Sequence, residues 1–371
     1  MRIVYILKDN LNKRPPILSV CQHLLDSGHE LTLLIRGISE ETRREFEEKG
    51  AKIILIKDSS PFQSIPQIGK MISLYLFHRK VTALLKKLEF DYVWVGSADA
   101  TLTVGKALLQ YKFILQIQEL YDQQPRYRKG LAEYMRKAAL VFVPEQTRAE
   151  IFRAWYSLKK TPAVLPNKPY YHPRNRNLPI TVPEVQAVFD KIPKDAKIVL
   201  YQGGVSHKRD LKPIARAIEE LGEKWALVVQ CPTVDNEYFK DFIANYKFYR
   251  VPYVPAPKHL EITSHVHLGL VTYTHISLNN EFCARNKIWE YSGFGLPMIG
   301  NDVSGLTRTI GNCKAGVCMN LDNITIEKIK DFLLELEENY ETYSKNATAM
   351  YDALDVPKII KGALESLGEK A

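Results

Sequence analysis

The feature that most constrains the fold of this chain is a recurring alternation between short apolar runs and longer stretches of helical periodicity. The chain opens with an apolar run over Arg2–Leu7, a polar loop over Lys8–Arg14 and a helical stretch over about Pro16–Ser27 that Gly28 ends. A second apolar run follows at Glu30–Ile35. Alternation of this kind predicts a parallel, doubly wound sheet of the α/β class.

The same alternation runs through the rest of the chain in two blocks. In the first block we expect further strands at Lys52–Ile56, Asp91–Val95, Phe113–Ile117, Leu140–Val143 and Ala163–Leu165. In the second block we expect strands at Lys197–Gln202, Trp225–Gln230, Phe248–Val251, Leu268–Thr272, Pro297–Gly300 and Gly316–Met319. Between the blocks, the segment Asn167–Lys194 is polar and rich in proline, so we place the domain boundary there.

A chain of 371 residues exceeds the size at which one hydrophobic core usually suffices. The sequence therefore predicts two tandem Rossmann-like, doubly wound domains over residues 1–168 and 169–351, with a ligand cleft between the carboxyl edges of their sheets. We expect one tail helix over about Thr325–Tyr343 and another over about Val356–Leu367. The last segment, about 352–371, is expected to pack back on the first domain.

Composition describes a globular protein of a reducing compartment. Apolar residues make up 46% of the chain and charged residues 25%, and the five cysteines are an odd number without paired spacing. The first residues lack the pattern of a signal peptide, and no run of about 18 apolar residues would span a bilayer. We therefore expect a cytoplasmic protein.

Charge is distributed unevenly along the chain. Residues 1–200 carry +12 and residues 201–371 carry −3, which together give the net +9. This excess indicates either an anionic partner for the first half, such as a membrane surface, or charge that serves solubility. The segment Ile65–Leu88 mixes apolar and basic residues, so it is either a helix lying on anionic lipid at the inner membrane face or an ordinary core-facing helix.

The stretch Asn279–Asp302 carries the strongest functional pattern. A helix is expected to begin near Asn286, which places Lys287 in the first turn, where free backbone N–H groups attract anions. Glu290 follows one turn deeper on the same side. Such a helix could bind a diphosphate and a ribose diol together, or it could be an ordinary amphipathic helix.

A glycine loop precedes a helix in the same domain. It reads Gly203-Gly204-Val205-Ser206-His207-Lys208-Arg209, and Arg209 could form paired hydrogen bonds with phosphate oxygens. The spacing is neither that of a Walker loop nor that of a dinucleotide fingerprint, and a plain tight turn is the alternative. Because two cations and a helix N-terminus can neutralise a departing diphosphate, and no Asp-x-Asp pair follows a strand, we expect no metal and no cofactor.

These motifs resemble a known family. Asn280-Glu281-Phe282, then Asn286-Lys287-x-x-Glu290-Tyr291 and Gly295-Leu296-Pro297-Met298-Ile299, resemble the nucleotide-sugar-binding segment of GT-B glycosyltransferases of the retaining group 1, family 4-like kind. The loop Tyr201-Gln202-Gly203-Gly204 with Arg209 is similar to their phosphate loop. The resemblance implies a GT-B fold and transfer of a hexose-type sugar from a nucleoside diphosphate to an acceptor.

The resemblance also implies roles for residues. Glu290 would hold the ribose, Arg209 and Lys287 would be catalytic by holding the diphosphate, and the backbone of 252–255 would meet the base. The implied donor-binding set is Gly203, Gly204, His207, Arg209, Tyr253, Phe282, Cys283, Asn286, Lys287 and Glu290, with the amides of Phe282 and Cys283 against the sugar. Two positions depart from the family pattern: Phe282 stands where many members have Glu, and Arg285 stands where Pro is common.

The acceptor is expected on the first domain. Its candidate residues follow predicted strands, and they are Asp9, Asn10, Arg14, Asp99, Gln118 and Glu119. The implied acceptor is a saccharide or a lipid-linked saccharide, as in bacterial surface polysaccharide synthesis. Relatives often place a His where Gln118 stands, so a His acid or base is not expected there.

Two other functions fit the same architecture. A nucleotide-sugar epimerase would need carboxylates or a His at the sugar, and mass-neutral conversion would identify it. An inactive glycosyltransferase-like partner would bind a nucleotide sugar without transfer. Nucleic-acid binding is disfavoured because the basic residues are not interleaved with an aromatic platform.

Overall fold

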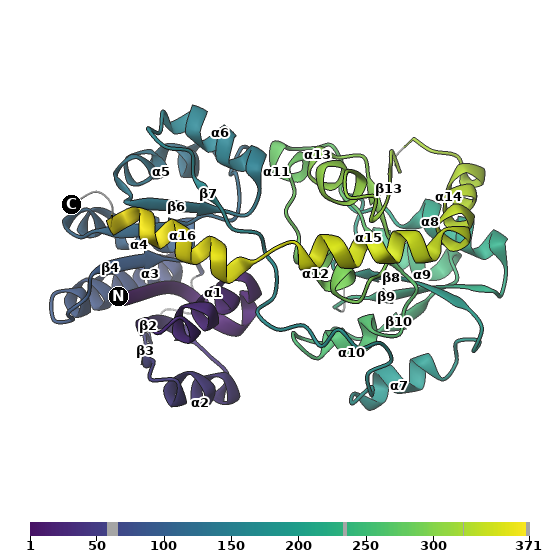
Figure 1. The fold of residues 1–371 in the computed structure, drawn as a ribbon, viewed down its shortest axis with the longest axis horizontal. Helices are drawn as coiled ribbons and strands as arrows, with labels where there is room; N and C mark the ends of the chain where they lie inside the picture. The colour runs from purple at the N-terminus through teal and green to yellow at the C-terminus, as the bar shows by residue number, and fades with distance from the viewer. Residues whose placement is uncertain (58–65, 233–235, 322, 369–371) are drawn as a thin grey trace. The chain divides into compact units, whose positions relative to one another are not determined.

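The structure is a computed structural model that describes residues 1–57, 66–232, 236–321 and 323–368. The chain divides into two compact units, one formed by Met1–Tyr170 with Asp355–Ala371 and the other by Tyr171–Leu354. Figure 1 shows the elements of both units. Each unit contains a parallel sheet with helices around it, so the expected α/β class is confirmed.

The first unit has a sheet with the strand order β3-β2-β1-β4-β5-β6-β7, and the described pairings are all parallel. Its strands are β1 Arg2–Asn10, β2 Glu30–Gly37, β3 Lys52–Leu55, β4 Tyr92–Val95, β5 Phe113–Gln116, β6 Leu140–Val143 and β7 Ala163–Val164. Its helices are α1 Pro15–Asp26, α2 Glu40–Glu48, α3 Pro66–Leu85, α4 Ala98–Val104, α5 Pro125–Lys137, α6 Gln146–Tyr156 and α16 Val356–Gly368, with short 3-10 turns at Leu11–Lys13 and Gly105–Gln110. Helix α16 buries Val356, Ile360 and Leu364, which lie four residues apart on one face.

The segment predicted as a polar loop, Lys8–Arg14, is partly regular. Strand β1 continues to Asn10, which pairs with Gly37 of β2, and a 3-10 turn follows. The Asn10 side chain accepts a hydrogen bond from the N–H of Asn12, and Leu11 is buried. The loop prediction was therefore wrong for Lys8–Asn10, because a polar strand end can pair as well as an apolar one.

The second unit has a sheet with the strand order β10-β9-β8-β11-β12-β13, again with parallel pairings. Its strands are β8 Lys197–Gln202, β9 Trp225–Gln230, β10 Tyr249–Val251, β11 Leu268–Val271, β12 Met298–Asn301 and β13 Gly316–Met319. Its helices are α7 Pro183–Phe189, α8 Lys212–Leu221, α9 Glu237–Asn245, α10 His259–Thr263, α11 Leu278–Glu281, α12 Asn286–Gly293, α13 Ser304–Leu306, α14 Ile326–Glu338 and α15 Tyr340–Asp352, with a π-helical turn at Thr307–Gly311.

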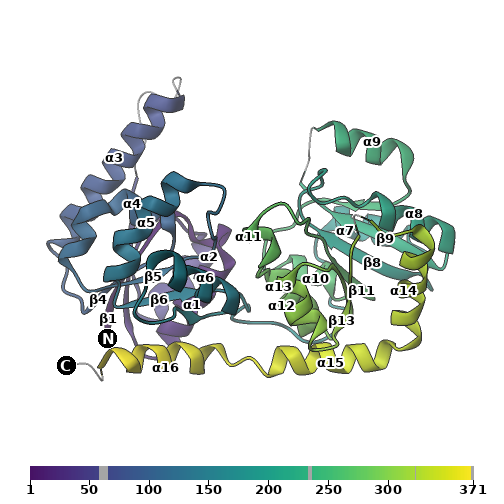
Figure 2. The ribbon, with the colours of Figure 1, turned by 90° about the horizontal axis from the view of Figure 1, so that it is seen from above.

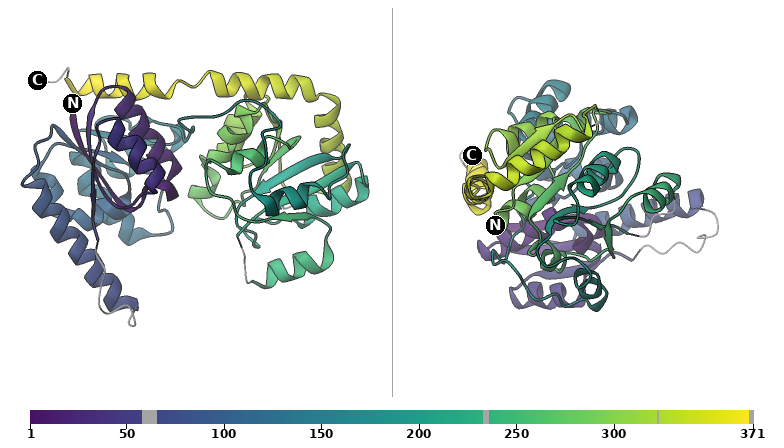
Figure 3. Two further views of the ribbon diagram at one scale, coloured as in Figure 1. Left: turned by 90° about the horizontal axis from the view of Figure 1, so that it is seen from below. Right: turned by 90° about the vertical axis from the view of Figure 1, so that its right-hand side faces the viewer.

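Two helices of this unit differ from the sequence prediction. The single helix expected over Thr325–Tyr343 is in fact α14 followed by α15, which meet at Asn339. At Asn339 the backbone leaves helical geometry, with φ −104° and ψ 23°, and Figures 2 and 3 show α15 leaving in a new direction. The proline-rich segment also contains α7, which has Pro183 at its first position, where a missing N–H costs nothing.

Helix α12 is fixed on the sheet by one aromatic side chain. Tyr291 is fully buried, and its hydroxyl donates to the Leu200 carbonyl of β8 at 3.2 Å. A Cβ at Gly269 of β11 would lie 2.2 Å from the Tyr291 ring, so only glycine permits this approach. The first turn of α12 is thereby held beside the carboxyl ends of β8 and β11.

Candidate functional site

The glycine loop after β8 and the first turn of α12 come together in the second unit. The N–H of Gly203 donates to the Gln230 carbonyl at 2.9 Å, and Gly203 has a φ of +142°. A Cβ on this residue would lie 2.9 Å from Nζ of Lys287 and 3.3 Å from Nη1 of Arg209. The structure therefore places Gly203, Arg209 and Lys287, three residues singled out from the sequence, at one point.

Two aromatic rings support the cations at this point. Nζ of Lys287 lies 4.9 Å from the centroid of the Tyr201 ring. The guanidinium groups of Arg209 and Arg285 lie 5.5 Å and 4.6 Å from the centroid of the Tyr273 ring. Cation–π contacts of this kind hold charge in place without neutralising it. We call Arg209, Arg285 and Lys287 the cation cluster.

The surroundings of Lys287 disfavour its charged form. Desolvation of its ammonium group lowers the pKa of Lys287 to about 7, and the charge of Arg209 adds to this effect, although Glu290 acts in the opposite direction. A lysine with so low a pKa is a cation that its surroundings do not stabilise. An anion beside Lys287 would favour the charged form, so the cluster is suited to a diphosphate.

The N-terminus of α12 adds backbone donors to the same place. Arg285 precedes the helix in an extended conformation, and the described structure shows no side-chain cap there. Asn286 and Lys287 form the first turn of this eight-residue helix. Uncapped N–H groups and the positive dipole end complement the cation cluster as an anion site.

Glu290 lies one turn below the cluster and has a histidine partner that the sequence did not reveal. Its Oε1 lies 3.2 Å from Nε2 of His259, and both side chains are 13% exposed. Burial alone would raise the pKa of the Glu290 carboxyl, but the neighbouring His259 and Lys287 hold it below its usual value. Glu290 is therefore an ionised carboxylate beside the cation cluster.

A second histidine holds the backbone of the same helix. Nε2 of His172 donates to the Glu290 carbonyl at 2.9 Å, and its ring packs against Phe294 and Tyr351. Burial lowers the pKa of His172 to about 4, so the ring is neutral at pH 7. His172 lies in the segment taken as a linker, and no pattern in the sequence marked it or His259 as part of a site.

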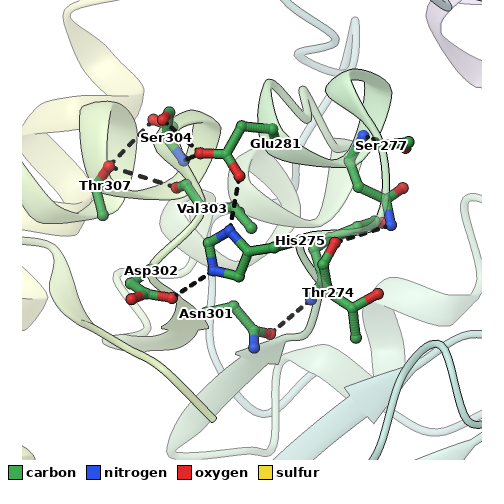
Figure 4. A network of polar contacts seen from close by, with 11 residues as sticks. Thr274, His275, Ser277, Glu281, Asn301, Asp302, Val303, Ser304 and Thr307 are labelled. Carbon is green, nitrogen blue, oxygen red and sulfur yellow. Dashed lines mark hydrogen bonds and ion pairs between the residues drawn. The ribbon is translucent and has the colours of Figure 1, made fainter. Parts of the chain in front are cut away.

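Glu281 precedes Phe282, the residue that departs from the family pattern, and its carboxylate contacts other side chains and backbone of the protein. Its carboxylate accepts from the N–H and the hydroxyl of Ser304, at 2.9 and 2.6 Å, and contacts Nδ1 of His275 at 2.8 Å. The other ring nitrogen of His275 contacts Asp302 at 2.8 Å, as Figure 4 shows. This network ties the start of α13 to the segment that follows β11.

The backbone N–H groups of Phe282 and Cys283, expected against a donor sugar, form hydrogen bonds within the chain. They donate to the carbonyls of Leu278 and Asn280 at 3.0 and 3.2 Å. The Cys283 side chain is buried in the core of the second unit. These amides end the short helix α11, so their hydrogen bonds are already used within the chain.

The remaining donor candidates lie at the edge of this site. Gly204 is exposed, and its carbonyl accepts from the Tyr201 hydroxyl at 2.7 Å. The exposed His207 packs edge-on against Tyr238 of α9, with the ring centroids 4.9 Å apart. Tyr253, in the loop after β10, is 64% exposed. The structure thus brings together Gly203, Arg209, Asn286, Lys287 and Glu290, and places His207 against another helix.

The acceptor-side candidates gather in the first unit, after β1, β4 and β5, which are neighbours in its sheet. Nε of Arg14 lies 2.8 Å from Asp9, and Asn10 caps the following turn. Gln118 and Glu119 both contact the buried guanidinium of Arg148, through the Gln118 carbonyl and the Glu119 carboxylate. The structure places these candidates at one edge of the sheet.

Asp99 is the most strongly held member of this group. It lies 2.5 Å from the buried ammonium of Lys8 and accepts from the Tyr127 hydroxyl at 2.7 Å. Burial would raise the pKa of Asp99, but these two hydrogen bonds outweigh it and lower the pKa. Tyr121, with φ +59°, stacks on Tyr127 at 4.9 Å and experiences the charges of Glu119, Asp99 and Arg14.

Comparison with known proteins defines the fold. No protein-family model matches the chain, and no curated protein matches it in sequence. Among solved structures, sucrose-phosphate synthase from Thermosynechococcus elongatus is similar with 13% identity, full coverage of both chains and a TM-score of 0.72. HepE of Anabaena, solved with UDP and glucose, is 12% identical over 99% of both chains with a TM-score of 0.70.

A third similar structure is WaaG, a glycosyltransferase involved in lipopolysaccharide biosynthesis. It is 14% identical, with 97% of this chain and 98% of WaaG covered and a TM-score of 0.65. The chain therefore has the GT-B fold, as its resemblance to GT-B glycosyltransferases implied.

The described residues contain no group of three or more His, Cys, Asp or Glu side chains arranged to hold a metal ion. Within the same residues, no helix combines the length and the apolar character needed to cross a membrane.

Proposed function

We propose that this protein is a glycosyltransferase that takes a nucleoside-diphosphate sugar on its second unit and a saccharide acceptor on its first. The observation that carries the proposal is the cation cluster of Arg209, Arg285 and Lys287 with the ionised Glu290 one helical turn away. A diphosphate fits the cations, and a ribose diol fits the carboxylate. The similarity to HepE, solved with UDP and glucose, supports a nucleotide of this kind.

The proposed reaction uses the cation cluster to stabilise the leaving group. The bond between the anomeric carbon of the sugar and the diphosphate oxygen breaks, and the released negative charge is neutralised by Arg209 and Lys287. A new bond forms between that carbon and the acceptor hydroxyl oxygen, whose proton passes to the departing phosphate. Attack from the face that the diphosphate leaves would retain the configuration, and the charges of the cluster would replace those of a metal ion.

The acceptor in this proposal is a saccharide or a lipid-linked saccharide of bacterial surface polysaccharide synthesis. The polar groups after β1, β4 and β5 supply hydrogen bonds, and the stacked Tyr121 and Tyr127 offer ring surface near them. Similarity to WaaG, a glycosyltransferase of lipopolysaccharide biosynthesis, supports this class of acceptor.

The experiment that tests the function incubates the protein with a panel of nucleoside-diphosphate sugars and oligosaccharide or lipid-linked acceptors, with EDTA present. Mass spectrometry should detect an acceptor heavier by one sugar and release of the nucleoside diphosphate. Mass-neutral conversion of the donor would identify an epimerase instead. Binding of a donor without either reaction, across the acceptor panel, would identify an inactive binding partner.

Helix α3 supports a peripheral position at the cytoplasmic face of the membrane. Its C-terminal half buries Phe77, Val81 and Leu85, whereas Ile68, Met71 and Tyr75 of its N-terminal half are 46%, 70% and 60% exposed. The C-terminal half is thus a core-facing helix, and the exposed N-terminal half is the part that we propose lies on lipid. Figure 2 shows the N-terminal half projecting from its unit.

Helix α3 has the charge that anionic lipid attracts. Its residues 66–85 include three exposed Lys or Arg and no Asp or Glu. Ile68, Met71 and Tyr75 recur at three and four residues and so share one side of the helix. Apolar side chains flanked by cations are typical of helices that lie in the membrane interface.

Vesicle sedimentation tests the membrane proposal. The protein should bind vesicles containing phosphatidylglycerol and not vesicles of phosphatidylcholine alone. The double substitution Met71→Asp with Tyr75→Asp should lower this binding at least tenfold, whereas Leu334→Asp, at an apolar residue of α14 that is 48% exposed, should not. Equal binding by all three proteins would contradict the proposal.

A further inference from the structure

We infer that His259 is a positioning residue that holds Glu290 for the ribose of the donor, so that this pair makes the site select ribonucleotides over deoxyribonucleotides. The inference rests on the proposed function, because it assigns Glu290 to the ribose. It goes further in naming a residue of helix α10 that holds Glu290 of α12 in position to bind the ribose.

The contact between the two side chains is defined by its geometry. Glu290 is ionised, and its oxygens only accept hydrogen bonds, so Nε2 of His259, at 3.2 Å from Oε1, carries a proton. Nδ1 of His259 is buried and has no hydrogen-bond partner among the described residues. Glu290 is thus the side-chain partner of this ring, which leaves Oε2 of the carboxylate for a ligand.

His259 is held in place by a buried polar network. Its carbonyl accepts from the Thr263 hydroxyl at 3.1 Å, and the same hydroxyl accepts from Nε2 of Gln202 at 3.2 Å. Nε2 of Gln202 also donates to Gln230 at 2.6 Å, and Gln230 donates to the carbonyl of Val254 at 3.4 Å. This network joins helix α10, which begins at His259, to the end of β8.

The chain before Gly203 belongs to the same network, because Gln202 immediately precedes it. The N–H of Gly203 donates to the carbonyl of Gln230. The glycine loop at the cation cluster and helix α10 with His259 are therefore positioned by the same buried glutamines. This arrangement sets His259 and the proposed diphosphate position in a fixed relation.

Glu290 needs such a partner because a competing cation lies on its own helix. Lys287 is three residues earlier, a spacing at which helical side chains meet, and the two charges attract each other. Without His259 the carboxylate would turn toward Lys287. It would then be lost to the ribose and would neutralise part of the charge meant for the diphosphate.

The test compares the full-length protein with His259→Leu, His259→Gln and a control, His265→Gln. His265 belongs to the same stretch of chain, but its Nε2 contacts the Leu178 carbonyl at 2.6 Å, a structural contact away from Glu290. Isothermal titration calorimetry with UDP and 2′-deoxy-UDP gives the ratio of the two dissociation constants for each protein. ADP and GDP with their deoxy forms serve in the same way if either binds more tightly than UDP.

Wild-type protein and His265→Gln should prefer the ribonucleotide at least about tenfold, the size expected for hydrogen bonds to a charged group. His259→Leu should bring the ratio of dissociation constants to within about twofold of one. His259→Gln, whose amide can reach the position of Nε2, should restore most of the preference for the ribonucleotide. Binding of inorganic pyrophosphate by His259→Leu shows that the variant is folded around an intact cation cluster.

The outcomes separate the two claims. Failure of the wild type to bind any of these nucleotides would overturn the proposed function and this inference with it. Nucleotide binding with an unchanged ribose preference in His259→Leu would overturn the inference alone. Wild-type binding without ribose preference would also overturn it, while leaving the diphosphate site in place.

Discussion

Gly203 and Lys287 come so close together that a single methyl group cannot fit between them. A Cβ on Gly203 would lie 2.9 Å from the ammonium nitrogen of Lys287, although Gly203 follows β8 and Lys287 belongs to the first turn of α12. The atoms that would have to move are the flexible ends of Lys287 and Arg209. Gly203 therefore matters more for where the charges of Lys287 and Arg209 lie than for the packing of the protein.

Gly203→Ala should weaken nucleotide binding more than it weakens the fold. Its φ of +142° is unfavourable for alanine and costs about 1–3 kcal/mol of stability, while the displaced cations lower affinity for a nucleoside diphosphate at least about tenfold. Gly204→Ala is the matched comparison, since its methyl would meet no described atom within 4 Å. Calorimetric affinities that fall equally in both variants would contradict this account of Gly203.

Arg209→Ala and Lys287→Ala should each lower the rate of sugar transfer about 100- to 1,000-fold, the usual cost of removing one group that stabilises developing charge. Neither should lower the melting temperature much, and Lys287→Ala should raise it, because a desolvated cation beside Arg209 is removed. Lys208→Ala, an exposed cation of the same loop, is the control and should keep normal turnover. Near-normal rates in both active-site variants would be incompatible with the proposed roles.

Donor binding should be coupled to protonation of Lys287. Its pKa of about 7 means that the ammonium is mostly charged at pH 6 and mostly neutral at pH 8.5, whereas a bound diphosphate favours the charged form. Affinity for a nucleoside-diphosphate sugar should therefore fall roughly 30-fold from pH 6 to pH 8.5. Lys287→Arg should abolish this dependence, because arginine stays charged; a pH dependence that persists in this variant would assign it to another group.

His275 should stabilise the second unit more at acidic than at alkaline pH. Hydrogen bonding to Asp302, reinforced by Glu281, raises the pKa of His275 above its usual value. The stabilisation is fully present below a pH of about 6.5, and it is lost as the pH rises through the raised pKa of His275 in the folded protein. Because this ring is partly exposed, the loss on His275→Gln should stay below about 1 kcal/mol.

Urea unfolding of the wild type and His275→Gln at pH 6 and pH 9 checks this prediction. The difference in unfolding free energy between the two proteins should be larger at pH 6. A difference that is the same at both values, or larger at pH 9, would show that the ring contributes by packing and not by charge.

Much of the fold follows from sequence patterns that depend on neighbouring residues. Strands such as β8 and β9 are continuous apolar runs, as expected for strands buried on both faces, and they pair in the parallel orientation that was predicted for the sheet. The break at Asn339 was missed because apolar periodicity continues on both sides of it, and only the cap at that residue ends α14.

In the site, too, some contacts could be predicted from the sequence and others could not. Arg209 and Lys287 could be predicted to meet because both follow strands whose carboxyl ends share one edge. The partner of Glu290 could not be predicted, since His259 lies 31 residues earlier at the start of the short helix α10, whose position depends on buried glutamines. Likewise, the hydrogen bonds of the Phe282 and Cys283 N–H groups within the chain could not be predicted, because the four-residue helix α11 has no distinct pattern in the sequence.

The central claim, that the second unit binds a nucleoside diphosphate through the cation cluster, is tested most directly by calorimetric titration. The wild type and the double variant Arg209→Ala with Lys287→Ala would be titrated with the uridine, adenosine, guanosine, cytidine and thymidine diphosphates in EDTA. We predict that at least one binds the wild type with one site and that its affinity falls at least about 100-fold in the double variant. Absence of binding for all five, or equal affinity in both proteins, would contradict the claim.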